Sequence, residues 1–285
     1  MGAGMAARLA AAGHALSVFN RTASRAEPLA RLGARVGESP RAAAENADVI
    51  IGMTADDESS RAMWLGETGA LASRNAPDAL AIECSTLSHD WVLELAGYVR
   101  ARGFRYVDAP VTGLPDAAAA GTLTLLVGAE PADLDAARPV FATLATRVLH
   151  FGGVGQGTVY KLMVNLLGAV QIASAAEGVA LAQAAGLDLR LVADAVASGQ
   201  AASPQVVRNV RRFISGDHTQ NVNFTPALRL KDIEYALRLA RRLGASHTFG
   251  ETAAVLYRKL CAAGYARDNE SRIIDLLRAG PSGGS

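Results

Sequence analysis

The first half of the chain alternates short apolar runs with longer amphipathic stretches. Continuous apolar runs such as residues 48–53 and 80–84 are bounded by turn residues, which is typical of strands buried on both faces. Stretches of helical periodicity separate one run from the next, and this order predicts βαβ units and a mostly parallel, doubly wound sheet. The expected strands are residues 15–19, 48–53, 80–84, 105–108, 122–127 and 147–151.

The pattern changes after the last of these runs, where no further strand is expected. The glycine-rich segment 152–157 leads into a long helix over residues 158–185. Residues 162–176 carry no charge, but Asn165 and Gln171 interrupt this run and it is too short for a bilayer, so we expect a buried helix and no membrane span. Further helices are expected at residues 188–198, 203–214, 226–243, 249–263 and 270–279, with a loose tail at 281–285.

Composition narrows the class of protein. A chain of 285 residues that is 50% hydrophobic, with a net charge of +1, is too apolar and too evenly charged to be disordered. Cys84 and Cys261 cannot form a disulfide framework, and no signal peptide is recognisable, so we expect a cytoplasmic protein. Cation pairs such as Arg211 and Arg212 lack interleaved aromatic residues, which favours a solvated or oligomer-facing surface over a nucleic-acid interface.

A helical pattern begins at Gly2, directly at the start of the chain. In dinucleotide-binding units, the third glycine of Gly-x-Gly-x-x-Gly opens such a helix where it packs closely on the sheet. If Gly2 is that glycine, the first strand and two glycines precede Met1, and we expect the native chain to extend upstream by about ten residues. The alternative is an Ala- and Gly-rich amphipathic helix that binds no cofactor.

The turn after residues 15–19 consists of Asn20, Arg21 and Thr22. A carboxylate at this position usually binds the ribose 2′-hydroxyl of NAD, and this turn holds none. Arg21 instead offers bidentate donors for a 2′-phosphate. The turn therefore favours NADP over NAD, unless it is a surface turn with an exposed arginine.

Only three of the 28 cationic side chains are lysines, namely Lys161, Lys231 and Lys259. Arginine does not release its proton in proteins, whereas a buried ammonium can, so lysine is favoured where a proton is transferred. A compositional bias towards arginine is the alternative explanation. Lys161 and Asn165 lie at positions i and i+4 of the long expected helix, which places them on one face.

Two long motifs together resemble the β-hydroxyacid dehydrogenase family, which includes 3-hydroxyisobutyrate dehydrogenase, tartronate semialdehyde reductase and the glyoxylate/succinic semialdehyde reductases. Residues 108–128 contain Asp-Ala-Pro-Val-Thr-Gly-Leu and Gly-Thr-Leu-Thr, and residues 152–165 end in Gly-x-Gly-x-x-x-Lys-x-x-x-Asn. The resemblance covers essentially the whole chain. It implies an α/β fold class, with a Rossmann-like NAD(P)-binding domain over residues 1–152 and an all-α C-terminal substrate and dimerisation domain over residues 153–285, joined by a long helix.

The resemblance also implies a role for each matching residue. Lys161 becomes the general acid/base that protonates the alkoxide as hydride reaches the carbonyl carbon, with Asn165 binding substrate beside it. Thr112 and Gly113 stand where the family's Ser-Gly binds the substrate carboxylate. Leu114 replaces the second glycine of that motif, which narrows the site and leaves the shape of the substrate open.

The remaining implied residues lie around the cofactor and the substrate. Phe224 lies in a loop that can cover the substrate, and Lys259 matches no functional position and is interpreted as a surface residue. The residues implied in cofactor binding are Gly2, Asn20, Arg21, Thr22, Met53, Thr54, Thr86 and Lys231.

We therefore expect an NADP(H)-preferring oxidoreductase that acts on a small carboxylate-bearing substrate and forms a homodimer or homotetramer. Imine reductases share a related scaffold but usually replace the catalytic lysine, and inactive cofactor-binding oligomerisation scaffolds lose it, so Lys161 argues against both alternatives. Asp108, Asn209 and Asp232 lack the compact spacing of metal ligands, and we expect no metal.

Overall fold

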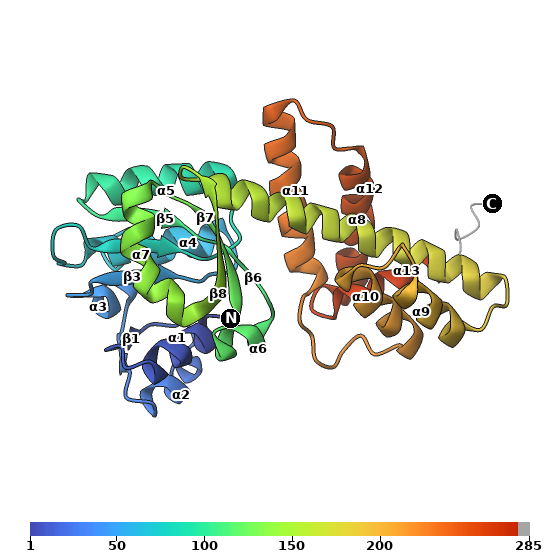
Figure 1. The fold of residues 1–285 in the computed structure, drawn as a ribbon, viewed down its shortest axis with the longest axis horizontal. Coiled ribbons are helices and arrows are strands. Elements are labelled where there is room, and N and C mark those ends of the chain that lie inside the picture. The colour runs from blue at the N-terminus through green and yellow to red at the C-terminus, as the bar shows by residue number, and fades with distance from the viewer. Residues whose placement is uncertain (279–285) are drawn as a thin grey trace. The chain divides into compact units, whose positions relative to one another are not determined.

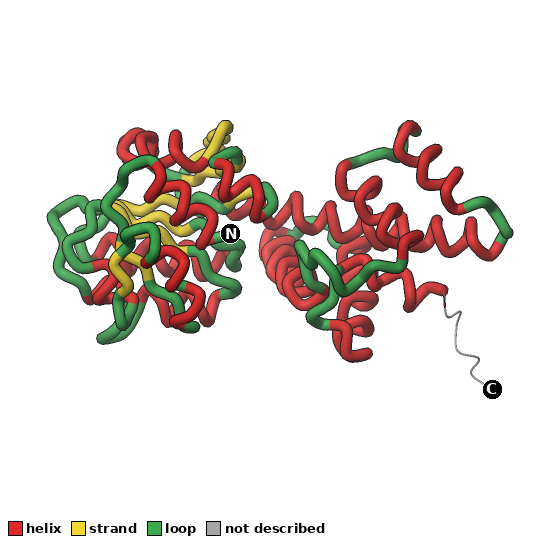
Figure 2. The backbone as a smooth tube through the Cα atoms, turned by 90° about the horizontal axis from the view of Figure 1, so that it is seen from below, coloured by secondary structure: helices red, strands yellow, loops and turns green. Residues whose placement is uncertain are grey.

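The computed structural model describes residues 1–278, and the chain divides into two compact units between Lys161 and Leu162. The division falls inside the long helix rather than at the glycine-rich segment 152–157. Strands occur in the first unit, whereas the described part of the second unit consists of helices and their connections (Figure 2).

A six-stranded sheet forms the centre of the first unit. Its strands are β3 (Val49–Gly52), β4 (Leu80–Glu83), β5 (Arg105–Asp108), β6 (Val111–Thr112), β7 (Leu123–Gly128) and β8 (Ala145–Gly152). Their order is β3-β4-β5-β7-β6, with β8 paired to β7. The pairs β3–β4, β4–β5 and β7–β8 are parallel, and β7 runs antiparallel to β5 and β6. The sheet is therefore dominated by parallel pairs, as the sequence pattern predicts.

Helices cover both faces of this sheet (Figure 1). They are α1 (Gly2–Ala11), α3 (Pro40–Ala44), α4 (Asp57–Trp64), α5 (His89–Ala101), α6 (Pro115–Ala120) and α7 (Pro131–Leu144), with a 3₁₀ turn at Ala70–Ala72. α2 (Glu27–Ala30) and the 3₁₀ turn at Ala23–Arg25 do not belong to the cores on these two faces. Successive strand residues point to opposite faces. Ile82 and Val107 pack with α1, α6 and α7, whereas Ala81 and Tyr106 pack with α3, α4 and α5. Burial on both faces explains the continuous apolar runs.

The first expected strand differs most from the prediction. Instead of a strand over residues 15–19 in the main sheet, the structure has β1 (Ser17–Val18), which pairs in parallel with β2 (Arg35–Val36) as a separate two-stranded sheet. The residues of both strands are half-buried or exposed, so they lack the burial that holds β3, β4 and β5 together. The sequence analysis missed β2 and β6 because two residues are too few to show a strand periodicity.

The helical elements after β8 follow the predicted order. They are α8 (Gln156–Ala184), α9 (Leu189–Ser198), α10 (Pro204–Ser215), α11 (Pro226–Leu243), α12 (Thr248–Leu260) and α13 (Ile273–Arg278), with a π-helical turn at Cys261–Tyr265 and a 3₁₀ turn at Glu270–Arg272. The helix expected over 249–263 corresponds to α12 and the π-helical turn that follows it, and Gly264, at φ +91°, leaves the helical conformation within that turn. Residue 279 and the expected tail at 281–285 lie outside the described residues.

Local sequence signals account for the ends of α10 and α11. Ser203 and Thr225 accept hydrogen bonds from the third backbone amide of each helix, and a proline follows each of them. Gly216 and Gly244 then end the two helices in the left-handed conformation.

α8 is also the one described helix that is long and apolar enough to cross a membrane by length and composition. Its inward face, with Ile172, Ala176 and Val179, packs in the core of the helical unit with Phe213 and Leu237. The core helix of a globular domain passes the same test, so this property is weak evidence for a membrane span.

Candidate active site

The start of α8, which carries Lys161, is tied to the sheet by Asp108. This residue ends β5 and is fully buried. Its Oδ2 accepts a hydrogen bond from the Thr158 backbone amide at 3.0 Å, and its Oδ1 accepts one from the Thr158 hydroxyl at 2.6 Å. Burial raises the pKa of Asp108 to about 7, and the hydrogen bonds from Thr158 and the Gly155 amide oppose that rise. Asp108 is therefore an anchor for the helix turn that precedes Lys161.

Close packing between α8 and β7 explains why this part of the chain is rich in glycine. A Cβ atom at Gly128, the last residue of β7, would lie 2.8 Å from Asp108 Oδ2 and 2.7 Å from the Gly153 carbonyl oxygen. A Cβ atom at Gly157 would lie 2.9 Å from the Gly128 backbone nitrogen and would overlap the Leu126 carbonyl. Only glycine permits this close approach of α8 to β7. Gly157 of the motif is therefore required for the packing of α8 on the sheet.

In the helical unit, Asn165 and Lys231 both contact Asp232. Asn165 is buried and its Nδ2 donates to Asp232 Oδ2 at 2.6 Å, while the Lys231 ammonium lies 3.0 Å from Asp232 Oδ1. Two residues predicted for different ligands are thus connected through one buried carboxylate. No role in this site was predicted for Asp232 from the sequence. Its position next to Lys231 in the chain is the one signal that could have indicated such a role.

Phe224 and Asn165 are connected in the same unit by Arg229. The Arg229 guanidinium carbon lies 4.3 Å from the centre of the Phe224 ring, and its Nη1 donates to the Asn165 carbonyl at 3.1 Å. Glu270 accepts from Arg229 Nε at 2.7 Å. Neither Arg229 nor Glu270 stands in a recognised motif, so the sequence analysis missed both.

The predicted carboxylate-binding pair lies on the edge of the main sheet. Thr112 ends β6 and pairs with Thr124 of β7, and its side chain is exposed. Gly113 follows at φ +133°, where a Cβ atom would lie 2.8 Å from a methyl carbon of Leu123, so glycine is required. Leu114 is 38% exposed and precedes the first turn of α6. An exposed hydroxyl and a constrained glycine are thus adjacent at this edge.

Three of the predicted cofactor residues lie at the carboxyl ends of β3 and β4, where open α/β sheets bind their ligands. Met53 and Thr54 follow β3, and Thr86 follows β4. Ser85 joins the two ends, because its hydroxyl accepts from the Thr54 amide at 2.6 Å. The buried Glu83 in turn accepts from the Ser85 amide at 3.0 Å. That Ser85 and Glu83 connect these strand ends was not predicted from the sequence.

Glu83 has further partners that fix it in place. Its Oε2 accepts from the Ser60 hydroxyl at 2.8 Å and from the Trp64 indole at 2.7 Å, and the Trp91 indole donates to the Ser60 hydroxyl at 2.9 Å. Because these side chains are buried, the network makes the ends of β3 and β4 rigid.

Gly2 lies at the first turn of α1, beside Met53. A Cβ atom at Gly2 would make ordinary contacts of 3.4 and 3.5 Å with the Met53 side chain. A closer approach occurs at Gly4, where a Cβ atom would lie 3.0 Å from the Ala119 backbone nitrogen, but this contact is with α6 and not with the sheet. The first turn of α1 contains no acidic residue and has no side-chain cap. A first turn without carboxylates fits a helix N-terminus that faces phosphate groups.

The remaining predicted cofactor residues form an exposed turn after β1. The Thr22 backbone amide donates to Asn20 Oδ1 at 2.9 Å, which fixes the turn and leaves Arg21 exposed within it. Lys259 is exposed on α12, in agreement with its interpretation as a surface residue.

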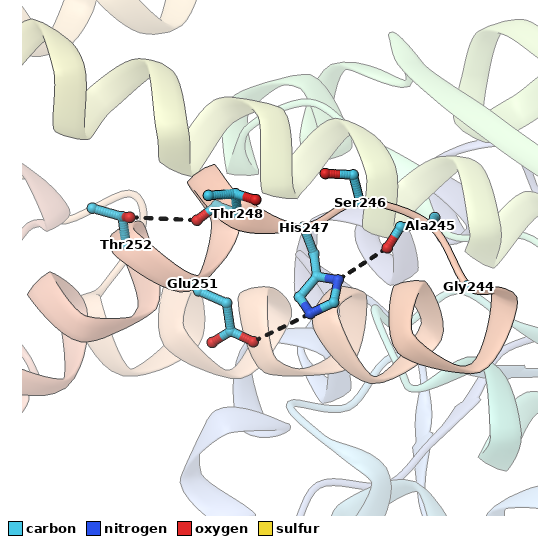
Figure 3. A pocket seen from close by; sticks show the side chains of 7 residues that line it. All are labelled: Gly244, Ala245, Ser246, His247, Thr248, Glu251 and Thr252. Atoms are coloured by element: carbon cyan, nitrogen blue, oxygen red, sulfur yellow. Dashed lines mark hydrogen bonds and ion pairs between the residues drawn. The ribbon is translucent and has the colours of Figure 1, made fainter.

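A separate depression of about 630 Å³ lies where α11 passes into α12 (Figure 3). It is lined by Gly244, Ala245, Ser246, His247, Thr248, Glu251 and Thr252. His247 contacts the Ala245 carbonyl at 2.9 Å and lies 3.7 Å from Glu251. None of the predicted site residues lines this depression. Among residues 1–278, no group of three or more His, Cys, Asp or Glu side chains is placed to hold a metal ion.

Comparison with known proteins identifies the family. Residues 1–153 match the NAD binding domain of 6-phosphogluconate dehydrogenase, and residues 155–277 match the NAD-binding domain of NADP-dependent 3-hydroxyisobutyrate dehydrogenase. The chain is 34% identical to the NAD-dependent L-serine dehydrogenase of Pseudomonas aeruginosa, over 97% of this chain and 94% of that protein. It is 30% identical to the mitochondrial 3-hydroxyisobutyrate dehydrogenase of Drosophila melanogaster, over 98% of this chain and 86% of that protein.

A solved structure agrees with these relatives. The Mycobacterium tuberculosis 3-hydroxyisobutyrate dehydrogenase with L-serine is 33% identical, covers 98% of this chain and 96% of its own, and superposes with a TM-score of 0.85. The chain therefore belongs to the β-hydroxyacid dehydrogenase family and is an NAD(P)-dependent hydroxyacid dehydrogenase.

Proposed function

We propose that the protein interconverts a small β-hydroxy acid and its semialdehyde or oxo acid, with NADP(H) as the preferred cofactor. One observation carries the proposal: Lys161 lies on α8 between a first turn anchored by Asp108 and the buried Asn165, one turn further on. The anchored turn and the buried Asn165 fix the stretch of α8 backbone from which the Lys161 side chain extends. This is what a general acid/base requires, because proton transfer depends on positioning within hydrogen-bond reach.

In this proposal Lys161 donates a proton to the oxygen of the carbonyl as it becomes an alkoxide, and removes that proton in the reverse direction. The Thr112 hydroxyl and the Gly113 amide bind the substrate carboxylate, and Asn165 and Phe224 contact the rest of the substrate. The bound cofactor supplies or accepts the hydride. The small size of the substrate follows from the family resemblance, and a substrate panel is needed to identify it.

The residues of the first unit fit a dinucleotide. The first turn of α1 at Gly2, which contains no acidic residue, suits the pyrophosphate, and the strand ends with Met53, Thr54 and Thr86 suit the nicotinamide half. Lys231 is the proposed cofactor contact from the helical unit. Arg21 supports NADP because it presents an exposed guanidinium in a turn of residues 20–22 that contains no carboxylate.

A substrate panel with two cofactors tests the proposal. NADPH and NADH oxidation is measured with glyoxylate, succinic semialdehyde and a cyclic imine, and reduction of NADP⁺ and NAD⁺ with 3-hydroxyisobutyrate and L-serine. Lys161→Ala should lower kcat by about two to four orders of magnitude on the substrate that turns over. Lys259→Ala, which removes an exposed lysine, is the matched control and should retain wild-type turnover. Near-normal activity of Lys161→Ala would contradict the assignment.

The cofactor preference is tested separately. Arg21→Asp should lower kcat/KM for NADPH by about tenfold to a hundredfold and leave that for NADH equal or higher, because a carboxylate repels the 2′-phosphate and accepts from a 2′-hydroxyl. An unchanged NADPH/NADH ratio would show that Arg21 does not bind the phosphate. Turnover of the cyclic imine alone would favour an imine reductase, and cofactor binding without any turnover would favour an inactive scaffold.

We also propose that the protein forms a homodimer or homotetramer through its helical unit. Exposed apolar side chains on this unit include Leu167 and Leu181 on α8 and Phe249 on α12, the last 76% exposed. Association with a second copy of the chain would remove such apolar side chains from water, which is favourable. Light scattering coupled to size-exclusion chromatography measures the mass, and a monomer at micromolar concentration would contradict the proposal.

A further inference from the structure

The segment that carries Phe224 runs from Gly216 to Thr225, between α10 and α11, and is here called the Phe224 segment. Within it, backbone carbonyls rather than side chains make most of the contacts with neighbouring elements. Arg212, in the last turn of α10, donates to the carbonyl oxygens of Asp217 at 3.3 Å, Gln220 at 3.1 Å and Asn221 at 2.9 Å. One guanidinium therefore fixes the first half of the segment at three points.

The second half of the Phe224 segment is fixed by Arg229 and Glu270. The Arg229 guanidinium lies against the Phe224 ring at 4.3 Å, and the Glu270 backbone amide donates to the Phe224 carbonyl at 3.0 Å. Glu270 also accepts from Arg229 Nε at 2.7 Å. Arg229 is only 3% exposed and Glu270 only 2%, so this pair lies out of solvent directly behind the ring.

Arg229 also links Phe224 to α8. Its Nη1 donates to the carbonyl oxygen of Asn165 at 3.1 Å. An i→i+4 helical bond does not exhaust the two lone pairs of a carbonyl, so Asn165 can accept this bond without breaking the helix. Two residues proposed to contact substrate, far apart in the sequence, thus share one buried cation. A lysine could not do this, because its single ammonium has neither the fork nor the flat face of a guanidinium.

We propose that Arg212 and Arg229 are positioning residues that hold the Phe224 segment as a fixed wall of the substrate site, so that Phe224 discriminates between substrates by its position and not by closing as a loop. The inference rests on the proposed function, because it takes Phe224 and Asn165 as substrate contacts. It makes more specific the expectation from the sequence that Phe224 lies in a loop that can cover the substrate. A preformed wall favours selectivity because it does not rearrange to accommodate a substrate of another shape.

The first experiment uses Arg212→Met, because Arg212 is half-buried and its removal leaves no buried charge unpaired. For the substrate that turns over, KM should rise about threefold to tenfold with kcat within about twofold, since the ring is displaced but the acid/base is not. The ratio of kcat/KM between two substrates that differ by one methyl group should fall towards one. Arg211→Met, which removes the exposed neighbour on α10, is the matched control and should leave both quantities unchanged.

The second experiment uses the double variant Arg229→Met, Glu270→Gln, which removes both charges together. Its folding is checked by circular dichroism and thermal unfolding. A folded double variant should show the same rise in KM and the same loss of discrimination, whereas KM for the cofactor should stay within about twofold of the wild type. Wild-type discrimination in both Arg212→Met and the folded double variant would overturn the proposal.

Hydrogen exchange separates this proposal from the proposed function. In the wild type, the Asn269 and Glu270 amides, which donate to the His218 and Phe224 carbonyls of this segment, should be protected without ligand and should gain little protection when NADP⁺ and substrate are added. Arg212→Met should lower that protection, because it releases the first half of the segment. A large gain of protection on ligand addition would show a closing loop and would overturn the fixed wall. If no β-hydroxy acid is turned over while the wild-type and Arg212→Met exchange patterns are as stated, the proposed function fails and the rigid segment stands.

Discussion

Each unit holds its predicted site residues in place with a buried acidic side chain. The partners of this side chain are neutral in the first unit and cationic in the helical unit. In the first unit, Asp108 accepts hydrogen bonds from neutral donors, the backbone amide and hydroxyl of Thr158. In the helical unit, Glu270 lies against the guanidinium of Arg229 at 2.7 Å and that of Arg208 at 3.4 Å. Each carboxylate lies behind a segment with a proposed substrate contact, but only Glu270 neutralises a buried cation.

This difference separates two ways of fixing a segment. A carboxyl group with neutral donors can be replaced by a neutral group of the same shape, because no opposite charge is left behind. A carboxylate that neutralises a buried cation cannot be replaced in this way, since desolvation then acts on an unpaired charge. The first unit should therefore depend on shape at Asp108, and the helical unit on charge at Glu270.

The largest effect is expected for Glu270→Gln. This change keeps the shape of the side chain but leaves Arg229 without a full counter-charge in a buried position, and it should lower the free energy of unfolding by about 3–5 kcal/mol. Urea denaturation followed by circular dichroism measures the loss. Glu234→Gln, which breaks the exposed pair with Arg258, is the control in the same unit and should cost at most about 1 kcal/mol. Equal losses in both variants would show that Glu270 is not needed for its charge.

An intermediate effect is expected for Gly157→Ala, which tests how far the first unit depends on shape. The added methyl group overlaps the Leu126 carbonyl and lies 2.9 Å from the Gly128 nitrogen, and neither backbone can shift easily. We expect a loss of about 1–3 kcal/mol. Gly178→Ala lies in the same helix with nothing within 4 Å of the new methyl group, and it should gain about 0.5–1 kcal/mol. A stabilising Gly157→Ala would contradict the close packing of α8 on β7.

The sequence predicted those parts of the molecule that depend on local patterns. Strands buried on both faces show as apolar runs, and α10 and α11 carry capping residues at their start and glycines at their end, so their bounds were predicted closely. β1 was placed in the wrong sheet, because a short apolar run does not show which strand will pair with it. The glycines at 155 and 157 were predicted as a family motif, but the steric reason for Gly157 depends on β7, and that for Gly155 depends on α5, where a Cβ atom would lie 2.8 Å from the His89 ring.

The supporting residues of the site could not be predicted in the same way. Asn165 contacts Asp232 across 67 positions of sequence, and Asp108 contacts Thr158 across 50. Such pairs leave no periodicity, and a single sequence contains no covariation. Arg229 and Glu270 were missed for the same reason, since a charged residue in a helical pattern is usually exposed. Only the fold shows that the four charged side chains among them are buried, namely those of Asp108, Arg229, Asp232 and Glu270.

The smallest effect, and the sharpest test of the comparison, is expected for Asp108→Asn. The amide keeps the shape and can exchange hydrogen bonds with Thr158, so the loss at pH 7 should be about 1–2 kcal/mol at most, well below that of Glu270→Gln. Burial raises the folded-state pKa of Asp108 to about 7 from the ordinary value of 3.8.

Because the pKa of Asp108 is raised in the folded protein, its contribution to stability depends on pH. Between about pH 4 and pH 7 the unfolded chain loses the Asp108 proton while the folded protein retains it, so the contribution of Asp108 to stability is fully present below about pH 4 and declines as the pH rises through 7. Unfolding free energies of the wild type and Asp108→Asn are measured from pH 4 to pH 8, because the other titrating groups cancel in the difference. The wild type should lose its advantage over the variant as the pH rises. A wild-type advantage that grows with pH would mean that Asp108 acts as a charged anchor, and the contrast between the two units would fail.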